Sequence, residues 1–434
     1  MTRRVIIVGG GFAGLNAAKG LANAPDIDVT LIDERNHHLF QPLLYQVATA
    51  GLSPAEIAEP IRAILSRARN ILVLRERVID VDLSRRVVVS DAGQHPYDYL
   101  ILACGSKHAY FGNEAWEEHA PGLKTLEQAT EIRRRVLSAF EEAEKETKSE
   151  VKRSLLTFVI VGGGPTGVEL AGAIGEMSRF TLARDFRQID PTLARVILIE
   201  AGPRILPTFS DKLASRAARD LESLGVQIWT DGPVTNIDSA GLNIGSERVA
   251  CRTVLWAAGV KASSLGLELG TELDRQGRVM VGGDLSLPKH PEVFVAGDQA
   301  HVADRDGNPL PGMAPAALQQ GRYLAQRIRK LVAGGVHPDF QFRDKGQMAT
   351  IGRRRAILES GGLEIAGIFA WAAWLVIHIY YLAGFKNRLF VVLQWAWSYF
   401  TYRRGARLIV GKNWRFYSDE SDESTESDKS HEPD

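Results

Sequence analysis

Short apolar runs closed by glycine recur along the chain and alternate with segments of helical spacing. Two of them are nearly the same: Val5–Gly14 reads VIIVGGGFAG, and Val159–Gly167 reads VIVGGGPTG. A small-residue stretch with the spacing of a helix follows each, Leu15–Leu21 and Val168–Met177. Because a strand, a glycine turn and a helix follow one another in both, the pattern predicts two copies of a dinucleotide-binding unit.

Four further apolar runs predict more buried parallel strands: LILACGS, VILIEAG, TVLWAAGV and VFVAGDQA. Thr125–Glu150 is predicted to be helical. A second long helix is predicted to begin near Pro315, to run through Ala316–Val332 and to end before Gly334. The fold class is therefore α/β, with two Rossmann-like dinucleotide-binding domains of the glutathione-reductase-like type and a C-terminal membrane-associating helical region.

The pattern divides the chain into four parts. Residues 1–120 and 288–345 form a first, discontinuous dinucleotide domain, and residues 152–287 form a second. Residues 346–416 are rich in tryptophan, tyrosine and arginine. Residues 417–434 are predicted to be disordered, because this tail holds eight acidic residues, one lysine and too few apolar side chains to fold.

Composition excludes several classes of protein. The 52 basic residues balance the 52 acidic ones, so no nucleic-acid partner is predicted. Cys104 and Cys251 lie far apart and form no CxxC or zinc pattern, which favours small buried hydrophobic residues over redox centres. No metal site is predicted. The first strand begins within a few residues of Met1, so no secretory signal is expected and the enzyme is placed on the cytoplasmic side.

The first glycine set is followed by an acid at the spacing of a ribose contact. Gly9 permits the tight turn, Gly11 lets the backbone approach a diphosphate, and Gly14 lets the helix pack on the strand. Asp33 stands nineteen residues after Gly14, at the end of the next strand. Asp298, after VFVAG, decides which dinucleotide binds, because a carboxylate there can accept from ribityl hydroxyls, which FAD has and NAD lacks. The first unit is therefore predicted to bind FAD.

The second glycine set, Gly162, Gly164 and Gly167, repeats this logic, with Glu200 closing VILIE. A carboxylate there accepts from the 2′-hydroxyl of NADH and repels the 2′-phosphate of NADPH. The spacing of 33 residues from Gly167 exceeds the usual one, and an insertion at Arg179–Pro191 accounts for it.

Three more residues are placed on the nicotinamide side. Glu169 lies in the first turn of the second helix, where it contacts the nicotinamide ribose or the flavin edge, or else only serves the helix dipole. Ala258 and Gly259 are predicted to give a close backbone approach. The helix that begins near Pro315 is expected to aim its positive end at the flavin ring.

The sequence resembles the type II NADH dehydrogenases, the single-subunit NADH:quinone oxidoreductases of respiratory membranes. The motifs that carry the resemblance are IVGGGFAGL, FQPLLYQVATAG, VIVGGGPTGVELAG, VLWAAGV, VFVAGDQA and ATIGRRRAI. The resemblance covers the chain except the acidic tail, and FQPLLYQVATAG and the aromatic C-terminal region are its most specific parts. It implies bound FAD, NADH as donor and a membrane quinone as acceptor, without proton pumping.

The resemblance also implies roles for individual residues. Those implied to contact FAD are Gly9, Gly11, Phe12, Ala13, Gly14, Asp33, Glu34, Gln46, Val78, Ala103, Gly105, Gly297, Asp298 and Ala316. Those implied to contact NADH are Gly162, Gly164, Pro165, Thr166, Gly167, Glu169, Glu200, Ala258 and Gly259. Those implied to contact the quinone are Pro315, Gln319 and Ile351, and Glu169, Gln319 and Gln320 are the candidate catalytic residues.

The chain departs from the family pattern at the predicted quinone site. The family commonly shows AQxAxQ after the GD motif, whereas this chain reads APAALQ, so Pro315 replaces the first glutamine. Gln319 is kept and Gln320 follows it, and the alternative is that both are ordinary helix-surface residues. Cys104 stands where the family usually has threonine.

The C-terminal region favours attachment to a membrane. Ile365–Gly384 holds twenty residues with no formal charge besides His378, and Leu389–Phe400 adds more aromatic residues. Arginine and lysine flank both runs. This composition favours a monotopic anchor over a transmembrane helix or a buried core helix, and places the protein on the cytoplasmic face of the inner (plasma) membrane. A homodimer is left open.

Two classes of alternative remain. The chain could be another FAD-dependent NAD(P)H reductase, of the sulfide:quinone or ferredoxin type. It could also be a non-catalytic, membrane-docked NADH-binding protein.

Overall fold

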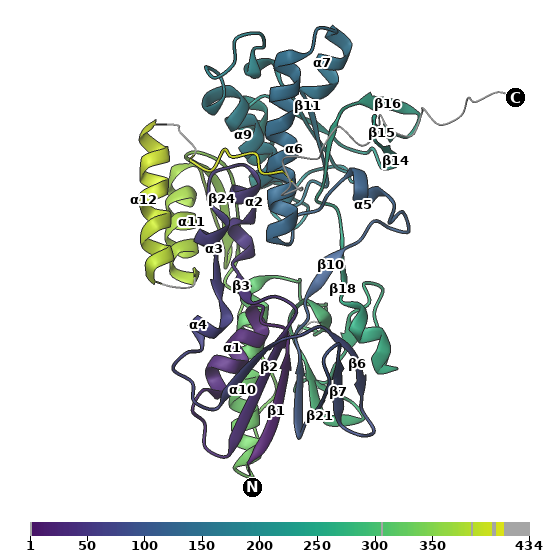
Figure 1. Ribbon diagram of the computed structural model, residues 1–434, viewed down its shortest axis with the longest axis vertical. Coiled ribbons are helices and arrows are strands. Elements are labelled where there is room, and N and C mark those ends of the chain that lie inside the picture. The colour runs from purple at the N-terminus through teal and green to yellow at the C-terminus, as the bar shows by residue number, and fades with distance from the viewer. Residues whose placement is uncertain (1, 305–306, 383–384, 402–404, 412–434) are drawn as a thin grey trace, which may run out of the picture.

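The computed structural model describes residues 2–304, 307–382, 385–401 and 405–411, and the acidic tail predicted at 417–434 lies outside these residues. Two lobes lie one above the other and are joined at the antiparallel strands β10 (Ser106–His108) and β18 (Val260–Ala262) (Figure 1). A pair of C-terminal helices lies along one side of this arrangement (Figure 1).

The lower lobe is built on a six-stranded sheet whose order is β20-β21-β9-β1-β2-β5. All neighbours are parallel except β20 and β21. Helices α1 (Phe12–Leu21) and α10 (Ala314–Val332) pack against each other on this lobe. The strands are β1 (Arg3–Val8), β2 (Ile27–Asp33), β5 (Ile71–Arg75), β9 (Tyr99–Leu102), β20 (Ser286–Leu287) and β21 (His290–Val295). Strand β1 is thus far from β20 and β21 in the sequence but shares one sheet with them, which is the arrangement of a discontinuous domain.

The upper lobe repeats the plan with a four-stranded parallel sheet of order β13-β12-β11-β17. Its strands are β11 (Thr157–Val161), β12 (Arg195–Ile199), β13 (Val226–Trp229) and β17 (Thr253–Trp256). Its helices are α6 (Leu126–Lys145), α7 (Ser149–Leu155), α8 (Pro165–Glu176) and α9 (Asp211–Ser223). The helix predicted at Thr125–Glu150 is therefore two helices, which Glu146 in an extended conformation separates.

Each lobe also carries an antiparallel three-stranded sheet. In the lower lobe these strands are β6 (Val78–Asp82), β7 (Val87–Ser90) and β8 (Gln94–Pro96). In the upper lobe they are β14 (Val234–Asp238), β15 (Gly241–Ile244) and β16 (Glu247–Ala250). The segment after β2 adds β3 (His37–Leu39), β4 (Ala58–Pro60) and the short helices α2 (Leu44–Ala48), α3 (Pro54–Ile57) and α4 (Ile61–Ile64).

The C-terminal region is not wholly helical, which corrects the sequence analysis. It begins with an antiparallel sheet of β23 (Gln347–Gly352), β24 (Arg355–Ser360) and β25 (Leu363–Ala366). The apolar run predicted from Ile365 is therefore shared between β25 and the 14-residue helix α11 (Ile368–Tyr381). Helix α12 (Phe385–Thr401) follows and packs on α11. Within the described ranges, no helix is both long and apolar enough to cross a membrane.

Candidate functional site

A cavity of about 830 Å³ lies at the carboxyl ends of β1, β2 and β9. This is the edge at which parallel sheets of this kind bind ligands. Eleven of the residues assigned to FAD line it: Gly9, Gly11, Phe12, Ala13, Asp33, Glu34, Val78, Ala103, Gly105, Gly297 and Asp298. The structure thus brings together residues that are up to 289 positions apart in the sequence, 9 to 298.

The glycines form a cradle at the start of α1. Gly9 has φ +102°, and a Cβ added there would meet the carbonyl oxygen of Ala103. A Cβ on Gly14 would meet the carbonyl oxygen of Gly9, because the helix lies against the turn. A Cβ on Gly11 would meet no atom within 4 Å. Two glycines are therefore required by the protein itself, while the third leaves open space for a ligand at the helix N-terminus.

Asp33 and His38 hold the backbone of this cradle through hydrogen bonds. The two carboxylate oxygens of Asp33 accept from the backbone N–H groups of Gly10, at 2.5 Å, and Arg35, at 2.7 Å. Burial raises the pKa of Asp33, and these hydrogen bonds oppose the shift. The buried His38 donates from Nδ1 to the Gly10 carbonyl at 2.9 Å. Burial lowers the pKa of His38 to about 4, so its ring is neutral at physiological pH.

Asp298 lines the same cavity within a polar cluster. Its Oδ2 accepts from Ser106 Oγ at 2.7 Å and lies 3.6 Å from Lys124 Nζ. The turn that holds it is fixed from α10, because the Gly297 N–H donates to Gln320 Oε1 at 2.6 Å. Sequence reasoning missed Ser106 and Lys124. Ser106 ends the run LILACGS and Lys124 lies in no motif, and only the fold brings them to Asp298.

Three residues assigned to FAD do not line the cavity. Gly14 lies beneath the turn, and Ala316 is buried in α10, next to a residue that does line it. Gln46 lies on α2, where its Oε1 accepts from Trp395 Nε1 at 2.8 Å and its Nε2 donates to the Tyr45 hydroxyl at 2.9 Å. Gln46 thus connects α2 to α12.

The second cradle reproduces the first at the start of α8. Gly162 has φ +110°, and a Cβ there would meet the Ala257 carbonyl group. A Cβ on Gly167 would meet the carbonyl oxygen of Gly162, and a Cβ on Gly164 would meet nothing within 4 Å. The same division between structural and ligand-facing glycines therefore holds in both lobes.

Glu200 occupies in the second cradle the place that Asp33 has in the first. Its Oε2 accepts from the Gly163 N–H at 2.7 Å and its Oε1 from the Gly202 N–H at 2.8 Å. Pro165 and Thr166, in the first turn of α8, are exposed. Ala258 and Gly259 follow β17, so they lie at the carboxyl end of the same sheet. A ligand on this cradle would be reached directly from solvent.

Glu169 is a residue of α8, the helix that packs against the C-terminal sheet. Burial raises the pKa of its carboxyl group to about 8, and a hydrogen bond from the Thr350 N–H opposes the shift only in part. The helix approaches β23 closely, because a Cβ on Gly172 would meet the carbonyl oxygen of Ile351. The Ile351 side chain is itself buried in the core. Glu169 therefore carries a proton at neutral pH.

The two glutamines of α10 have partners within the protein. Gln319 exchanges two hydrogen bonds of 3.0 Å with the backbone of Arg343, and the buried Gln320 holds the turn at Gly297. Pro315 is in the first turn of α10. These contacts favour positioning roles for both glutamines.

A column of aromatic rings leads from the first cradle to the C-terminal helices. Phe12 contacts Phe40, with ring centroids 5.9 Å apart, and Phe40 lies 6.1 Å from the ring of His378 on α11. His378 stacks on Trp374 at 4.2 Å, and Trp374 lies 5.5 Å from Trp395 on α12. The wall of the cavity and the outer helices thus belong to one packed unit.

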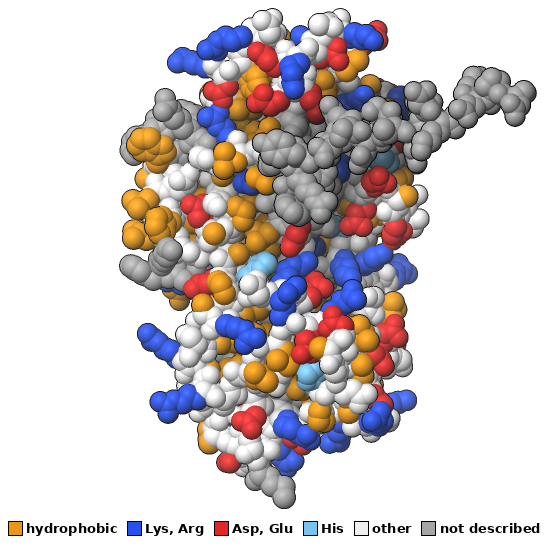
Figure 2. Space-filling view, viewed as in Figure 1, with side chains coloured by type: hydrophobic (Ala, Val, Ile, Leu, Met, Phe, Trp, Pro, Cys, Tyr) orange, Lys and Arg blue, Asp and Glu red, His pale blue; other side chains and the backbone are white. Residues whose placement is uncertain are grey.

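The outer faces of α11 and α12 are apolar. Side chains on this edge are seen as an orange patch over the two helices (Figure 2). The large hydrophobic residues exposed on them are Ile368, Phe369, Val376, Ile377, Tyr380, Leu389, Phe390, Val392, Leu393 and Trp397. Several residues of the predicted basic flank, Lys386, Arg403 and Arg404 among them, lie outside the described side chains.

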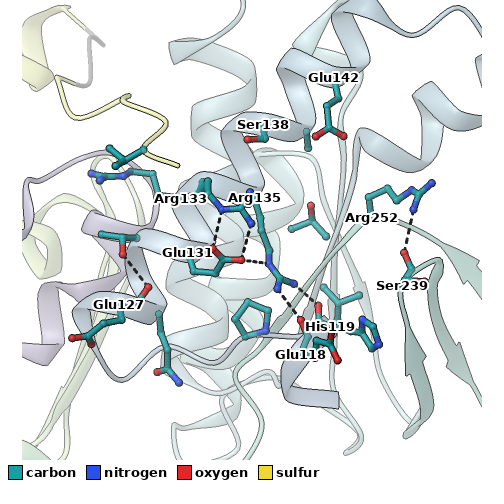
Figure 3. A pocket seen from close by; sticks show the side chains of 18 of the residues that line it. Glu118, His119, Glu127, Glu131, Arg133, Arg135, Ser138, Glu142, Ser239 and Arg252 are labelled. Atoms are coloured by element: carbon teal, nitrogen blue, oxygen red, sulfur yellow. Dashed lines mark hydrogen bonds and ion pairs between the residues drawn. The ribbon is translucent and has the colours of Figure 1, made fainter. Parts of the chain in front are cut away.

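A second hollow, of about 1100 Å³, lies beside α6 in the upper lobe. Glu131 accepts hydrogen bonds of 2.8 Å from Arg134 and from Arg135, two of the arginines that line it. Arg135 also donates to the backbone of α5 (Trp116–His119) (Figure 3). This hollow meets the first cavity at Glu117 and Gln128. It contains none of the residues assigned to a dinucleotide.

Comparison with known proteins agrees with this geometry. The family model described as pyridine nucleotide-disulphide oxidoreductase matches residues 3–321. Two type II NADH:quinone oxidoreductases of Mycobacterium tuberculosis are 46% and 45% identical to the chain, each over 94% of it and 90% of their own length. An internal alternative NAD(P)H-ubiquinone oxidoreductase of Arabidopsis thaliana mitochondria is 30% identical over 90% of the chain and 83% of its own length.

The fold is also that of a solved structure. The structure of NDH2 from Plasmodium falciparum in complex with NADH superimposes with a TM-score of 0.86, over 95% of this chain and 100% of that one, at 20% identity. A sulfide:quinone oxidoreductase from Aquifex aeolicus superimposes less well, with a TM-score of 0.72 at 18% identity, over 89% of this chain and 92% of that one.

Proposed function

The chain belongs to the type II NADH:quinone oxidoreductases, and from this membership we propose that it transfers a hydride from NADH to FAD and then two electrons to a membrane quinone, without pumping protons. The observation that carries the proposal is the pair of matched cradles. Each has a glycine open to a ligand, Gly11 or Gly164, and each has a carboxylate beneath it, Asp33 or Glu200.

FAD belongs to the first cradle. The cavity is walled by residues of both chain segments, 1–120 and 288–345, and the space at Gly11 suits a diphosphate. Asp298 offers a carboxylate to the ribityl hydroxyls. When bound, FAD supplies a hydride acceptor that can afterwards give up electrons in pairs. The protein contributes orientation and fixed charges.

NADH belongs to the second cradle, in residues 152–287. Glu200 is held by two backbone N–H groups, which leaves its carboxylate fixed where the adenosine ribose is expected. The negative charge favours NADH over NADPH. Because the first turn of α8 is open to solvent, NADH can enter and NAD⁺ can leave in each turnover.

Glu169 is the candidate proton donor for quinone reduction. Its pKa of about 8 means that its carboxyl group holds a proton at neutral pH, which a glutamate in water would not. It lies on α8 against β23, the strand that precedes the membrane-facing helices. We propose on this basis that Glu169 donates a proton as electrons reach the quinone.

Helices α11 and α12 are the proposed contact of the protein with the membrane and its quinone. Their exposed apolar faces suit a peripheral, monotopic attachment to lipid, and the aromatic column connects them to the wall of the flavin cavity. We propose that this attachment is at the cytoplasmic face of the inner (plasma) membrane, where a lipid-dissolved quinone is within reach.

The cysteines argue against the alternative reductases. Burial raises the pKa values of Cys104 and Cys251 to about 12, so neither is a thiolate at physiological pH. Disulfide and sulfide chemistry needs a thiolate nucleophile. The quinone acceptor is therefore favoured over a sulfur substrate.

Absorbance of the purified protein tests the proposal. The protein is expected to be yellow, to lose its flavin colour with NADH under anaerobic conditions and to regain it with a soluble quinone. Colour that is lost and not regained with quinone would point to another acceptor. A protein that takes up no FAD on reconstitution would refute the proposal.

A further inference from the structure

Lys124 is the most buried of the described cations that line the flavin cavity. Its side chain is 18% exposed, whereas those of Arg35 and Lys261 are 37% and 48% exposed and pair with glutamates at the rim. Lys107 and Arg77 are exposed as well. Among these cations, Lys124 therefore carries the positive charge that is least exposed to solvent.

The backbone of Lys124 is held on both sides. Its N–H donates to Gln128 Oε1 at 2.8 Å, and its carbonyl accepts from Gln41 Nε2 at 3.3 Å. Thr125, the next residue, caps α6 by accepting from the Gln128 N–H at 3.2 Å. The lysine thus starts from a fixed point at the beginning of a 20-residue helix.

The side chain of Lys124 reaches a defined partner. Its Nζ donates to Ser106 Oγ at 2.6 Å, and the Ser106 hydroxyl in turn donates to Asp298 at 2.7 Å. The ammonium group and the carboxylate are 3.6 Å apart. Since Asp298 is the residue proposed to hold the ribityl chain, the ammonium group would lie beside that chain, which is attached directly to the flavin ring.

We propose that Lys124 is the cation that stabilises the reduced flavin and so sets its reduction potential. This inference rests on the proposed function, because it requires FAD in the cavity. Two-electron reduction with uptake of one proton leaves a negative charge on the flavin ring. The Lys124 ammonium balances the Asp298 carboxylate 3.6 Å away, so it offsets the repulsion that this carboxylate would otherwise exert on the reduced ring, and it acts beside the partial charge of about one half at the N-terminus of α10.

The test measures the flavin and needs no quinone. Lys124→Met removes the charge, Lys124→Gln removes it while keeping a hydrogen-bonding group, and Lys124→Arg keeps it. Lys289→Met, on an exposed turn outside the cavity, is the matched control. Each purified holoprotein is titrated with sulfite, which adds to flavin N5 and leaves a negative charge on the ring, and its midpoint potential is measured against redox dyes.

In both neutral variants we expect bound FAD, a sulfite dissociation constant raised roughly tenfold or more, and a lower midpoint potential, because a nearby charge is lost. Lys124→Arg is expected to stay close to the parent, and Lys289→Met to match it. FAD bound with unchanged sulfite affinity and potential would overturn the inference and leave the proposed function intact. Loss of FAD from both neutral variants would also overturn it, because Lys124 would then serve to hold the cofactor. A parent protein that binds no FAD would refute the proposed function instead.

Discussion

The two glycine cradles are alike in their backbone and different in what covers them. Gly9 and Gly162 have similar φ angles, +102° and +110°, and a carboxylate below each cradle accepts from a glycine N–H. Around the first cradle, Ala13 in the first turn of α1 is buried, and α10 presses on it so closely that a Cβ on Gly321 would meet its carbonyl. Around the second, the first turn of α8 is open.

This difference matches the two kinds of ligand that the cradles are proposed to hold. A ligand enclosed by elements from both ends of the chain exchanges slowly, whereas one on an open helix terminus exchanges in each turnover. On the proposed assignment, the same local motif serves a resident cofactor in one lobe and a substrate in the other. What distinguishes them is tertiary packing, since the motifs themselves are nearly the same.

The largest effect is expected when a side chain fills the open glycine of each cradle. Gly11→Val and Gly164→Val should both fold, because nothing lies within 4 Å of the added Cβ. Gly11→Val should be colourless, and Gly164→Val should be yellow but no longer bleached by NADH. Flavin absorbance and anaerobic NADH titration measure both outcomes. Two variants with the same phenotype would contradict the assignment of different ligands to the cradles.

A smaller effect is expected from the carboxylates. Glu200→Gln should raise the KM for NADH by roughly tenfold, about 1.4 kcal/mol, and reduce discrimination against NADPH. Asp33→Asn should weaken FAD binding and leave the preference between NADH and NADPH unchanged. Steady-state kinetics with both nucleotides and the flavin content of dialysed protein separate the two. A change of nucleotide preference in Asp33→Asn would show that the cradles had been assigned the wrong way round.

The local pattern was enough to predict the two Rossmann-like units, because strand, glycine turn, helix and acid all lie within one stretch of sequence. The second unit could be predicted even though Glu200 stands 33 residues after Gly167, compared with a spacing of nineteen between Gly14 and Asp33. The C-terminal region was harder. The apolar run from Ile365 onward was expected to be helical throughout. Its first two residues, Ile365 and Ala366, instead pair with β24, and α11 begins only at Ile368.

The parts of the site that were missed depend on distant contacts. Lys124 and Ser106 meet Asp298 across 174 and 192 positions, and Gln46 meets Trp395 across 349. Ser106, Asp298 and Gln46 each lie in a motif quoted above, and Gln46 was assigned to FAD, yet no motif indicates which distant residue each of them contacts. Gln319 and Gln320 were singled out because the family pattern contains a glutamine there, whereas their partners in the structure are backbone groups of the protein itself.

Glu169, on α8 against β23, should affect turnover without affecting the binding of either ligand. Glu169→Gln should slow quinone reduction roughly tenfold or more, as expected for loss of a proton donor, with FAD bound and flavin bleaching by NADH unchanged. Because the pKa is raised to about 8, the parent rate should fall as pH rises through 8, where the carboxyl group loses its proton. The variant should lack this decline. Stopped-flow absorbance separates the two half-reactions, and a slower bleaching step would place Glu169 on the NADH side instead.

The smallest expected effect concerns the hydrogen bond that holds a glycine carbonyl group in each cradle. His38 supports the Gly10 carbonyl in the first cradle, whereas the backbone N–H of Leu206 supports Gly163 in the second, at 2.8 Å. Burial lowers the pKa of His38 from 6.5 to about 4, and the nearby charges of Lys19 and His37 add to the shift.

Protonation of His38 is therefore disfavoured in the folded state. The stability that the neutral ring contributes is fully present above pH 6.5 and is lost as the pH drops toward 4. Release of FAD should accelerate several-fold between pH 7 and 5.5, and His38→Gln, which can still donate to Gly10, should weaken this dependence. NADH binding should change less over the same range, since a backbone N–H does not titrate. FAD release that depends on pH equally in the parent and in His38→Gln would assign the effect to other groups, such as His108 and His378, whose pKa values are also lowered to about 4.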